Sequence, residues 1–143
     1  MKLRDIMTKP VVRIRPEETV AVAARMLERN NIGALPVCRS DGRLCGMITD
    51  RDIVIRCLAT DKKMENTTVK DVMTNRLYVG RPDMEVSVAA GLMGREQIRR
   101  LPVMENGKLC GIVSLCDLAG KEESRIEAKA ALAEISSNLS SRY

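Results

Sequence analysis

The chain has 143 residues, of which 45% are hydrophobic and 30% charged, and its formal net charge is +5. This length suits one compact domain, and no apolar run approaches the roughly 20 residues that a membrane span needs. Histidine is absent, and Tyr78 and Tyr143 are the only aromatic residues, which argues against a zinc site, a histidine-based catalytic triad or a platform for stacking single-stranded nucleic acid.

The five cysteines form no CxxC pair. An odd number of thiols without that spacing is typical of a protein that is kept reduced, and the first residues do not have the pattern of a secretory signal. We therefore expect a cytoplasmic protein without a metal site. We interpret Cys45 and Cys110, which precede matching glycines, as small hydrophobic residues on equivalent strands.

The sequence contains two copies of one pattern. LRDIMT returns as VKDVMT after 66 residues, and GMITDRDI returns as GIVSLCDL after 65 residues. These segments are Leu3–Thr8 with Val69–Thr74, and Gly46–Ile53 with Gly111–Leu118. A repeat of this length cannot bury its own apolar face, so we expect the copies to pack on each other about a pseudo-two-fold axis.

The first copy predicts a β-α-β-β-α unit. A short strand at Val11–Ile14 is followed by a helix for which Thr19 is the expected N-cap, because apolar residues then recur at helical spacing. The segments Leu35–Cys38 and Leu44–Thr49 enclose an Asp-Gly turn and predict a β-hairpin. A second helix is expected from Asp50.

The second copy predicts the same elements in the same order. Its first strand is expected at Leu77–Gly80, and its last helix begins at Leu115. The expected fold class is α/β, with two packed β-α-β-β-α repeats and a C-terminal helix. The expected boundaries are 1–60 for the first repeat, 61–68 for a polar connector, 69–120 for the second repeat and 121–143 for a helical tail.

The helical tail has one apolar stripe, formed by Ala128, Leu132, Ile135 and Leu139. A stripe at this spacing favours a helix that packs against other elements. We expect the tail to pack on the rest of the domain or across a dimer interface.

Two glycines distinguish the first long helix of the second copy from that of the first. Gly91 and Gly94 stand where the first copy has Arg25 and Glu28. Each glycine costs about 1 kcal/mol relative to alanine inside a helix. We therefore expect another group to approach this helix closely.

A hydroxyl and a carboxylate stand where each hairpin passes into the following helix. They are Thr49 and Asp52 in the first copy, and Ser114 and Asp117 in the second. The spacing is that of a capping box, in which both side chains satisfy backbone donors of the first helical turn. The arrangement also suits a nucleotide, because the hydroxyl and the helix start attract a phosphate while the carboxylate can accept hydrogen bonds from a ribose diol.

The repeated motifs resemble those of a known family. The first copy has IMT near its start, LPV in its hairpin and the ending GMITDRD, and the second copy has VMT, LPV and the ending GIVSLCD. This order of motifs, found in both copies, resembles that of the paired cystathionine β-synthase (CBS) domain module, also called the Bateman module. The resemblance extends from Leu3 to about Leu118. It is strongest to bacterial CBS pairs that stand alone without an attached enzyme or channel.

The resemblance implies an adenosine-containing ligand in each of two clefts between the halves. Thr49 with Asp52, and Ser114 with Asp117, would contact phosphate and ribose. One cleft would be lined by Thr8, Val11, Gly33, Ala34 and Pro36, and the other by Thr74, Leu77, Arg99, Arg100 and Pro102. The implied ligands are AMP, ADP or ATP, with NAD or S-adenosylmethionine as further candidates, and the implied assembly is a homodimer.

The two implied clefts differ in one respect. Gly33 and Ala34 of the first copy correspond to Arg99 and Arg100 of the second. A pair of guanidinium groups can clamp a phosphate, which favours a polyphosphate at the second site. The alternative is that both arginines lie on a solvated edge or contact the last helix.

We interpret the chain as a non-catalytic regulatory module. An adenine nucleotide would enter a cleft, shift the packing of the halves and change a surface that a downstream protein reads. The alternative is a structural or dimerisation module with empty or vestigial clefts. An enzyme is disfavoured because no nucleophile is paired with an obvious base, and nucleic-acid binding through the positive charge would predict a steep salt dependence.

Overall fold

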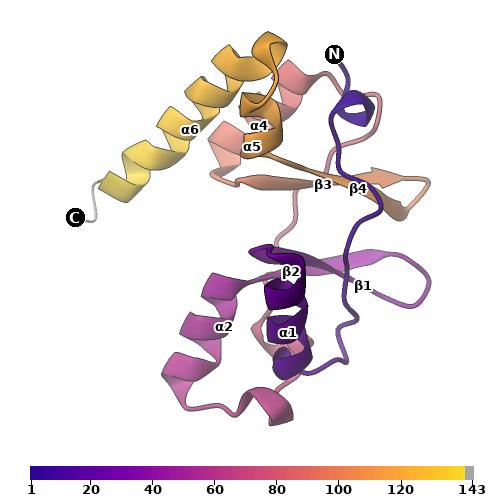
Figure 1. The fold of residues 1–143 in the computed structure, drawn as a ribbon, viewed down its shortest axis with the longest axis vertical. Coiled ribbons are helices and arrows are strands. Elements are labelled where there is room, and N and C mark those ends of the chain that lie inside the picture. Colours follow the sequence, from indigo (N-terminus) through magenta and orange to yellow (C-terminus); the bar gives the residue numbers. More distant parts are fainter. Residues whose placement is uncertain (141–143) are drawn as a thin grey trace. The chain divides into compact units, whose positions relative to one another are not determined.

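The computed structural model describes residues 1–140, and the side chains of residues 1–137. It has a mixed α/β fold with two compact units (Figure 1). The α1 unit comprises Val12–Leu77 with Gly107–Leu109, and the described part of the α4 unit comprises Met1–Val11, Tyr78–Asn106 and residues 110–140. Among the helices of the described residues, none has both the length and the apolar character that crossing a membrane requires.

The α1 unit is an antiparallel hairpin packed with helices. Its elements are α1 (Val20–Asn30), β1 (Ala34–Cys38), β2 (Leu44–Thr49), α2 (Asp50–Arg56) and α3 (Val69–Val72), with 3-10 turns at Leu58–Thr60 and Met64–Asn66. Thr19 accepts a hydrogen bond from the Val22 amide at 3.2 Å, which confirms the expected N-cap. Leu35 pairs with Ile48 in the hairpin, and both are fully buried in the core of the unit.

The α4 unit repeats this arrangement and adds one helix. Its elements are α4 (Val86–Glu96), β3 (Arg100–Glu105), β4 (Lys108–Ser114), α5 (Leu115–Ala119) and α6 (Arg125–Ser140), with 3-10 turns at Leu3–Asp5 and Glu122–Ser124. Strands β3 and β4 form a two-stranded sheet. Met93, Leu101 and Leu118 are fully buried in its core.

The strand expected before the first long helix of each copy is reduced to one residue. Ile14 forms a parallel bridge with Val37, and Gly80 forms one with Val103. The residues on either side of both bridges belong to no strand. The predictions of strands over 11–14 and 77–80 are therefore wrong in extent.

Each unit contains the IMT segment of the other copy of the repeat, which is residues 6–8 (IMT) in the first copy and residues 72–74 (VMT) in the second. Thr74 exchanges backbone hydrogen bonds with Met47 at 2.8 and 2.9 Å, and Thr8 does so with Ile112 at 2.9 and 3.2 Å. Leu3 is fully buried in the core of the α4 unit. Each compact unit therefore combines residues from both copies of the sequence repeat. The domain boundaries expected from the repeat stay a prediction.

A methionine of each IMT segment lies over a strand glycine. A Cβ on Gly46 would stand 2.5 Å from Met73 Sδ, and a Cβ on Gly111 would stand 2.5 Å from Met7 Sδ. A side chain at either glycine would therefore displace the methionine, so glycine suits the place where the segment crosses the strand. The repeated methionine and glycine are therefore explained by packing.

Helix α6 packs along α4 and α5 (Figure 1). Its Ala128, Ala131 and Ile135 are buried in the core of the α4 unit, which confirms that the tail packs on the domain. Leu132 was expected on the same face but is 48% exposed, because the buried face follows Ala131 instead. Leu139 lies outside the described side chains.

Helix α6 also explains one of the two helix glycines. A Cβ on Gly94 would stand 3.3 Å from Ala131 Cα and 2.5 Å from the Glu134 carboxylate. The two helices therefore approach too closely for a larger residue. Among the described atoms, a Cβ on Gly91 would meet only Arg95 Nη1, at 3.3 Å. The expected close approach is confirmed at Gly94 and is not found at Gly91.

Candidate functional site

Strand β2 passes into α2 at Thr49, and this corner is a complete capping box. The Asp52 amide donates to Thr49 Oγ1 at 3.0 Å, and the Thr49 amide donates to Asp52 Oδ2 at 3.0 Å. These bonds satisfy backbone donors at the helix start that would otherwise lack a partner. The structural role expected for this pair is therefore present.

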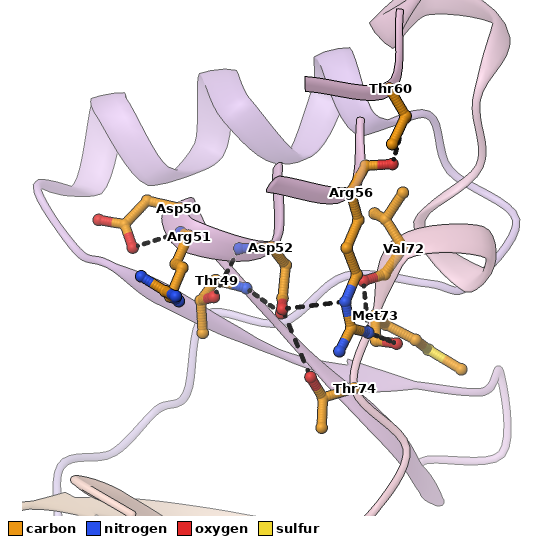
Figure 2. A network of polar contacts seen from close by, with 9 residues as sticks. All are labelled: Thr49, Asp50, Arg51, Asp52, Arg56, Thr60, Val72, Met73 and Thr74. Atoms are coloured by element: carbon orange, nitrogen blue, oxygen red, sulfur yellow. Dashed lines mark hydrogen bonds and ion pairs between the residues drawn. The ribbon is translucent and has the colours of Figure 1, made fainter. Parts of the chain in front are cut away.

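Asp52 also contacts two groups outside the capping box (Figure 2). Its Oδ1 accepts a hydrogen bond from the Thr74 hydroxyl at 3.4 Å and lies 3.9 Å from Arg56 Nε. Only 12% of the Asp52 side chain is exposed, so salt screens these contacts less than those of a surface pair. The carboxylate is thus held by the corner, by α2 and by the segment after α3.

Arg56 joins α2 to the segment that precedes Thr74. Its Nη1 donates to the Met73 carbonyl at 3.0 Å and to the Val72 carbonyl at 3.3 Å. A cation is favourable there because the last carbonyls of a helix carry partial negative charge. Sequence reasoning missed Arg56 as a site residue. The available signal was its place four residues after Asp52, the spacing at which side chains on one helix meet.

Strand β4 passes into α5 at a second capping box. The Ser114 amide donates to Asp117 Oδ2 at 2.7 Å, the Ser114 hydroxyl donates to the same oxygen at 2.9 Å, and the Asp117 amide donates to Ser114 Oγ at 3.2 Å. The ion pairs of the described residues do not include Asp117. Among the described residues, the hydrogen bonds to this carboxylate therefore come from Ser114 and reach Oδ2.

The turn that precedes each hairpin closes onto the corner. The Gly33 carbonyl accepts a hydrogen bond from the Asp50 amide at 3.0 Å, and the Arg99 carbonyl accepts one from the Leu115 amide at 3.0 Å. Gly33 therefore lies beside the first capping box, and Arg99 lies beside the second. Arg99 and its neighbour Arg100 are exposed, and the ion pairs of the described residues include neither.

Pro36 and Pro102 occupy buried strand positions. The Pro36 carbonyl accepts the Ile14 amide at 3.0 Å, and the Pro102 carbonyl accepts the Gly80 amide at 2.8 Å. Both prolines therefore hold the single-residue bridges of their units. Ala34 is buried at the start of β1 and is the register partner of Thr49 in the hairpin.

Each group of lining residues implied by the resemblance contains residues of both compact units. Thr8 and Val11 belong to the α4 unit, although the resemblance grouped them with residues around Gly33. Thr74 and Leu77 belong to the α1 unit, although they were grouped with residues of β3. The structure instead brings Thr74 to Asp52 of its own unit. The membership of the two expected groups stays a prediction.

Cys45 and Cys110 occupy matching positions in the two hairpins. Their thiols donate to the carbonyls of Val37 at 3.4 Å and Val103 at 3.3 Å. Burial raises the pKa of both thiols, so both are protonated at neutral pH and behave as weak donors in an apolar setting. Across the described side chains, no cluster of three or more His, Cys, Asp or Glu residues is arranged to hold a metal ion.

The family model and the curated relative that match this chain both identify the CBS domain family. A model of the CBS domain matches residues 3–58 and again residues 69–123. The relative named CBS domain-containing protein YhcV, from Bacillus subtilis (strain 168), is 41% identical over 94% of this chain and 94% of its own length. The matches therefore extend over both copies of the repeat.

Solved structures show the same fold. Hypoxic Response Protein I, solved with two coordinated zinc ions, is 36% identical with a TM-score of 0.78, covering 84% of this chain and 98% of that one. The CBS domain pair of protein MJ0100, solved in complex with methylthioadenosine and S-adenosylmethionine, is 30% identical with a TM-score of 0.76, covering 84% of this chain and 94% of that one.

Proposed function

The chain belongs to the CBS domain family, and from that premise we propose that it is a non-catalytic regulatory module that binds an adenosine-containing ligand. One ligand site includes Thr49 and Asp52, and the other includes Ser114 and Asp117. Ligand binding shifts the packing around these corners and changes a surface that a downstream protein reads.

The observation that carries the proposal is the partly exposed carboxylate beside a helix start at both corners. The hydrogen bonds to Asp117 reach Oδ2, which leaves Oδ1 for a donor from a ligand. At Asp52, a ribose hydroxyl would replace the Thr74 hydroxyl, whose bond of 3.4 Å is long. The MJ0100 pair, solved with two adenosyl compounds, supports this ligand class.

Arg99 and Arg100 give the corner at Ser114 its own ligand preference. Both side chains are exposed, and the Arg99 carbonyl fixes this loop to the start of α5. Guanidinium groups bind phosphate oxygens in bidentate fashion. We therefore assign ADP or ATP to this corner in preference to AMP. The loop at Gly33 offers no comparable charge, so the corner at Thr49 takes a ligand with fewer phosphates.

We also propose that the protein is a cytoplasmic homodimer. Val54 and Ile55 of α2, and Leu58 just after it, are 51%, 50% and 51% exposed. We infer that these three exposed apolar side chains, which are close together in the sequence, form a surface that a second copy can cover. The stripe on α6 is less suitable, because Ala128 and Ile135 are already buried within the α4 unit.

The test is a set of thermal melts with AMP, ADP, ATP, NAD and S-adenosylmethionine, on the wild type and on Asp52→Ala and Asp117→Ala. A ligand at 100 times its dissociation constant stabilises a protein by about 2.7 kcal/mol, which is a shift of several degrees for a domain of this size. A shift that is lost in one variant assigns the ligand to that corner. No shift with any of the five ligands contradicts the proposal.

A structural or dimerisation module is the second candidate function. It is favoured by the capping boxes, since both carboxylates already satisfy backbone donors without any ligand. Truncation of the tail is a poor test because α6 contributes to the core. The better variant is Ile55→Asp with Leu58→Asp, compared with the wild type by sedimentation. Loss of the dimer, together with no ligand-induced melting shift in the wild type, would favour this second candidate.

A further inference from the structure

Arg56 has no part in the function proposed above, yet it joins three parts of the α1-unit corner. It is the last residue of α2, four residues after Asp52. Its side chain is half exposed, so core packing does not explain its placement. The contacts of its guanidinium are the feature that needs an explanation.

The guanidinium reaches an acid and a backbone segment together (Figure 2). Nε lies 3.9 Å from Asp52 Oδ1, while Nη1 donates to the Met73 carbonyl at 3.0 Å. A planar fork with several fixed donors can satisfy both partners, whereas the point charge of a lysine cannot. Arg56 therefore links the carboxylate to the segment that carries Thr74.

The groups on both sides of Arg56 are themselves held in place. The Thr60 hydroxyl donates to the Arg56 carbonyl at 2.9 Å (Figure 2), which secures the end of α2. Thr74 exchanges two backbone hydrogen bonds with Met47 of β2. The Met73 side chain lies over Gly46 of the same strand. The guanidinium thus connects two supported elements and preorganises the carboxylate between them.

Within the part of the chain that the structure describes, the corner of the second copy has no such link. Lys121 stands 65 residues after Arg56 in the sequence, beyond the end of α5 at Ala119. It borders a surface hollow with Asp5 and Glu122, and the ion pairs of the described residues do not join it to Asp117. Among the described residues, no ion pair joins a cation to the carboxylate of the α4-unit corner as Arg56 is joined to Asp52.

We propose that Arg56 is a positioning residue that sets the ligand preference of the α1-unit corner toward a nucleoside monophosphate over a neutral nucleoside. This inference rests on the proposed function of that corner. Arg56 offsets the charge of Asp52, which lowers the repulsion between the carboxylate and a ligand phosphate. It also holds Asp52 and the Thr74 hydroxyl in one arrangement, so that a ribose hydroxyl can replace that of Thr74 without further rearrangement.

The binding test uses AMP and adenosine as probes and is made in the Asp117→Ala background, which leaves the α1-unit corner as the site that is read. Calorimetry measures both dissociation constants for this protein with Arg56, with Arg56→Met and with Arg56→Lys. We expect Arg56→Met to weaken AMP by about tenfold, equivalent to about 1.4 kcal/mol, and adenosine by clearly less. Arg56→Lys should recover part of the AMP affinity. Equal losses for both probes, or no loss, would overturn the inference.

Hydrogen exchange gives a second reading that does not need a ligand. The Thr74 amide donates to Met47, and the Thr8 amide makes the equivalent bond to Ile112. Arg56→Met should accelerate exchange at Thr74 and leave Thr8 unchanged, and the matched control Lys121→Met should change neither. Unchanged exchange at Thr74 in Arg56→Met would show that Arg56 does not stabilise the segment that carries Thr74.

Failure of the proposed function and failure of the inference about Arg56 would give different results in this test. If the Asp117→Ala protein binds neither AMP nor adenosine, the proposed function of the α1-unit corner fails and the ligand preference fails with it. If that protein binds both probes and Arg56→Met leaves the ratio of their dissociation constants unchanged, the proposed function stands. In that case only the inference about Arg56 is overturned.

Discussion

The α1 unit and the α4 unit contain the same capping box in different surroundings. Asp52 is contacted by Thr49, Thr74 and Arg56, whereas the bonds to Asp117 come from Ser114. The part of the motif that starts a helix is thus retained in both copies. The groups around it, which decide what the carboxylate can bind, differ. A duplicated corner can therefore keep its folding role while its two copies diverge in ligand preference.

The two units differ as well in what covers their first long helix. Helix α4 is packed against α6 at Gly94, while α1 has the exposed Glu28 at the equivalent position. A Cβ on that glycine would stand 3.3 Å from Ala131 Cα and 2.5 Å from the Glu134 carboxylate of α6. The glycine is therefore a consequence of the added helix, and the two helices should respond differently to the same substitution.

The largest expected effect is at this contact. Gly94→Leu should lower the free energy of unfolding by about 2–3 kcal/mol, because overpacking against the Ala131 backbone exceeds the gain in helix propensity. The matched variant Glu28→Leu on the exposed face of α1 should stay within about 0.5 kcal/mol of the wild type. Urea unfolding measures both. Similar losses in the two variants would mean that α6 is not packed as described.

The next effect compares the two carboxylates without ligand. Asp52→Ala should cost about 2 kcal/mol, because it removes a cap and leaves Arg56 without its acid. Asp117→Ala removes a cap alone and should cost about 1 kcal/mol. Urea unfolding of both variants gives the difference. Equal costs would contradict the claim that Asp52 has additional partners.

A smaller effect, an increase in the free energy of unfolding, is expected when Gly91 of α4 is replaced. A Cβ on Gly91 would meet only the mobile end of Arg95 among the described atoms, so Gly91→Ala should raise the free energy of unfolding by about 0.5–1 kcal/mol through helix propensity. The measurement is the urea midpoint at constant slope. A lower midpoint would show that something approaches α4 at this point as well.

The smallest expected effect concerns the loss of stability at low pH, which should depend on the N-cap of α4 and not on the N-cap of α1. Hydrogen bonds from Lys2 and the N-terminal amine lower the pKa of Glu85, the N-cap residue of α4, below its ordinary value of 4.5. A lowered pKa contributes stability above that value, and the contribution is lost as pH falls through the folded pKa. Thr19, the N-cap of α1, does not titrate.

Glu85→Gln should therefore make the urea midpoint fall slightly less between pH 7 and pH 3. Glu85 is exposed to solvent, so the change should be small and should shrink further in salt. A steeper loss toward low pH in this variant would reverse the assigned sign. The variant should be compared with Thr19→Val, which removes a cap without changing the titration.

Much of the fold could be predicted because its signals are local. The capping residues Thr49 and Asp52 stand three positions apart, and the Thr19 cap needs only the first turn of its helix. The hairpins follow from turn residues between two short apolar segments. Such features depend on neighbours in sequence, which the sequence displays directly.

The missed features depend on contacts between distant residues. The two copies carry nearly the same motif, IMT in the first and VMT in the second, so no local pattern says which hairpin each segment joins. The contacts of Arg56 follow from that choice, because the carbonyls of Val72 and Met73 come from the other copy. The extent of the strands at Ile14 and Gly80 was misjudged for a related reason, since one bridging residue gives no periodicity.

The most direct test of the account is a calorimetric titration of AMP, ATP and S-adenosylmethionine into the wild type and into the double variant Asp52→Ala, Asp117→Ala. The account predicts that at least one of these ligands binds the wild type and that the double variant loses this binding while remaining folded by circular dichroism. A double variant that binds as tightly as the wild type would contradict the assigned corners. No heat with any ligand in the wild type would contradict the proposed function itself.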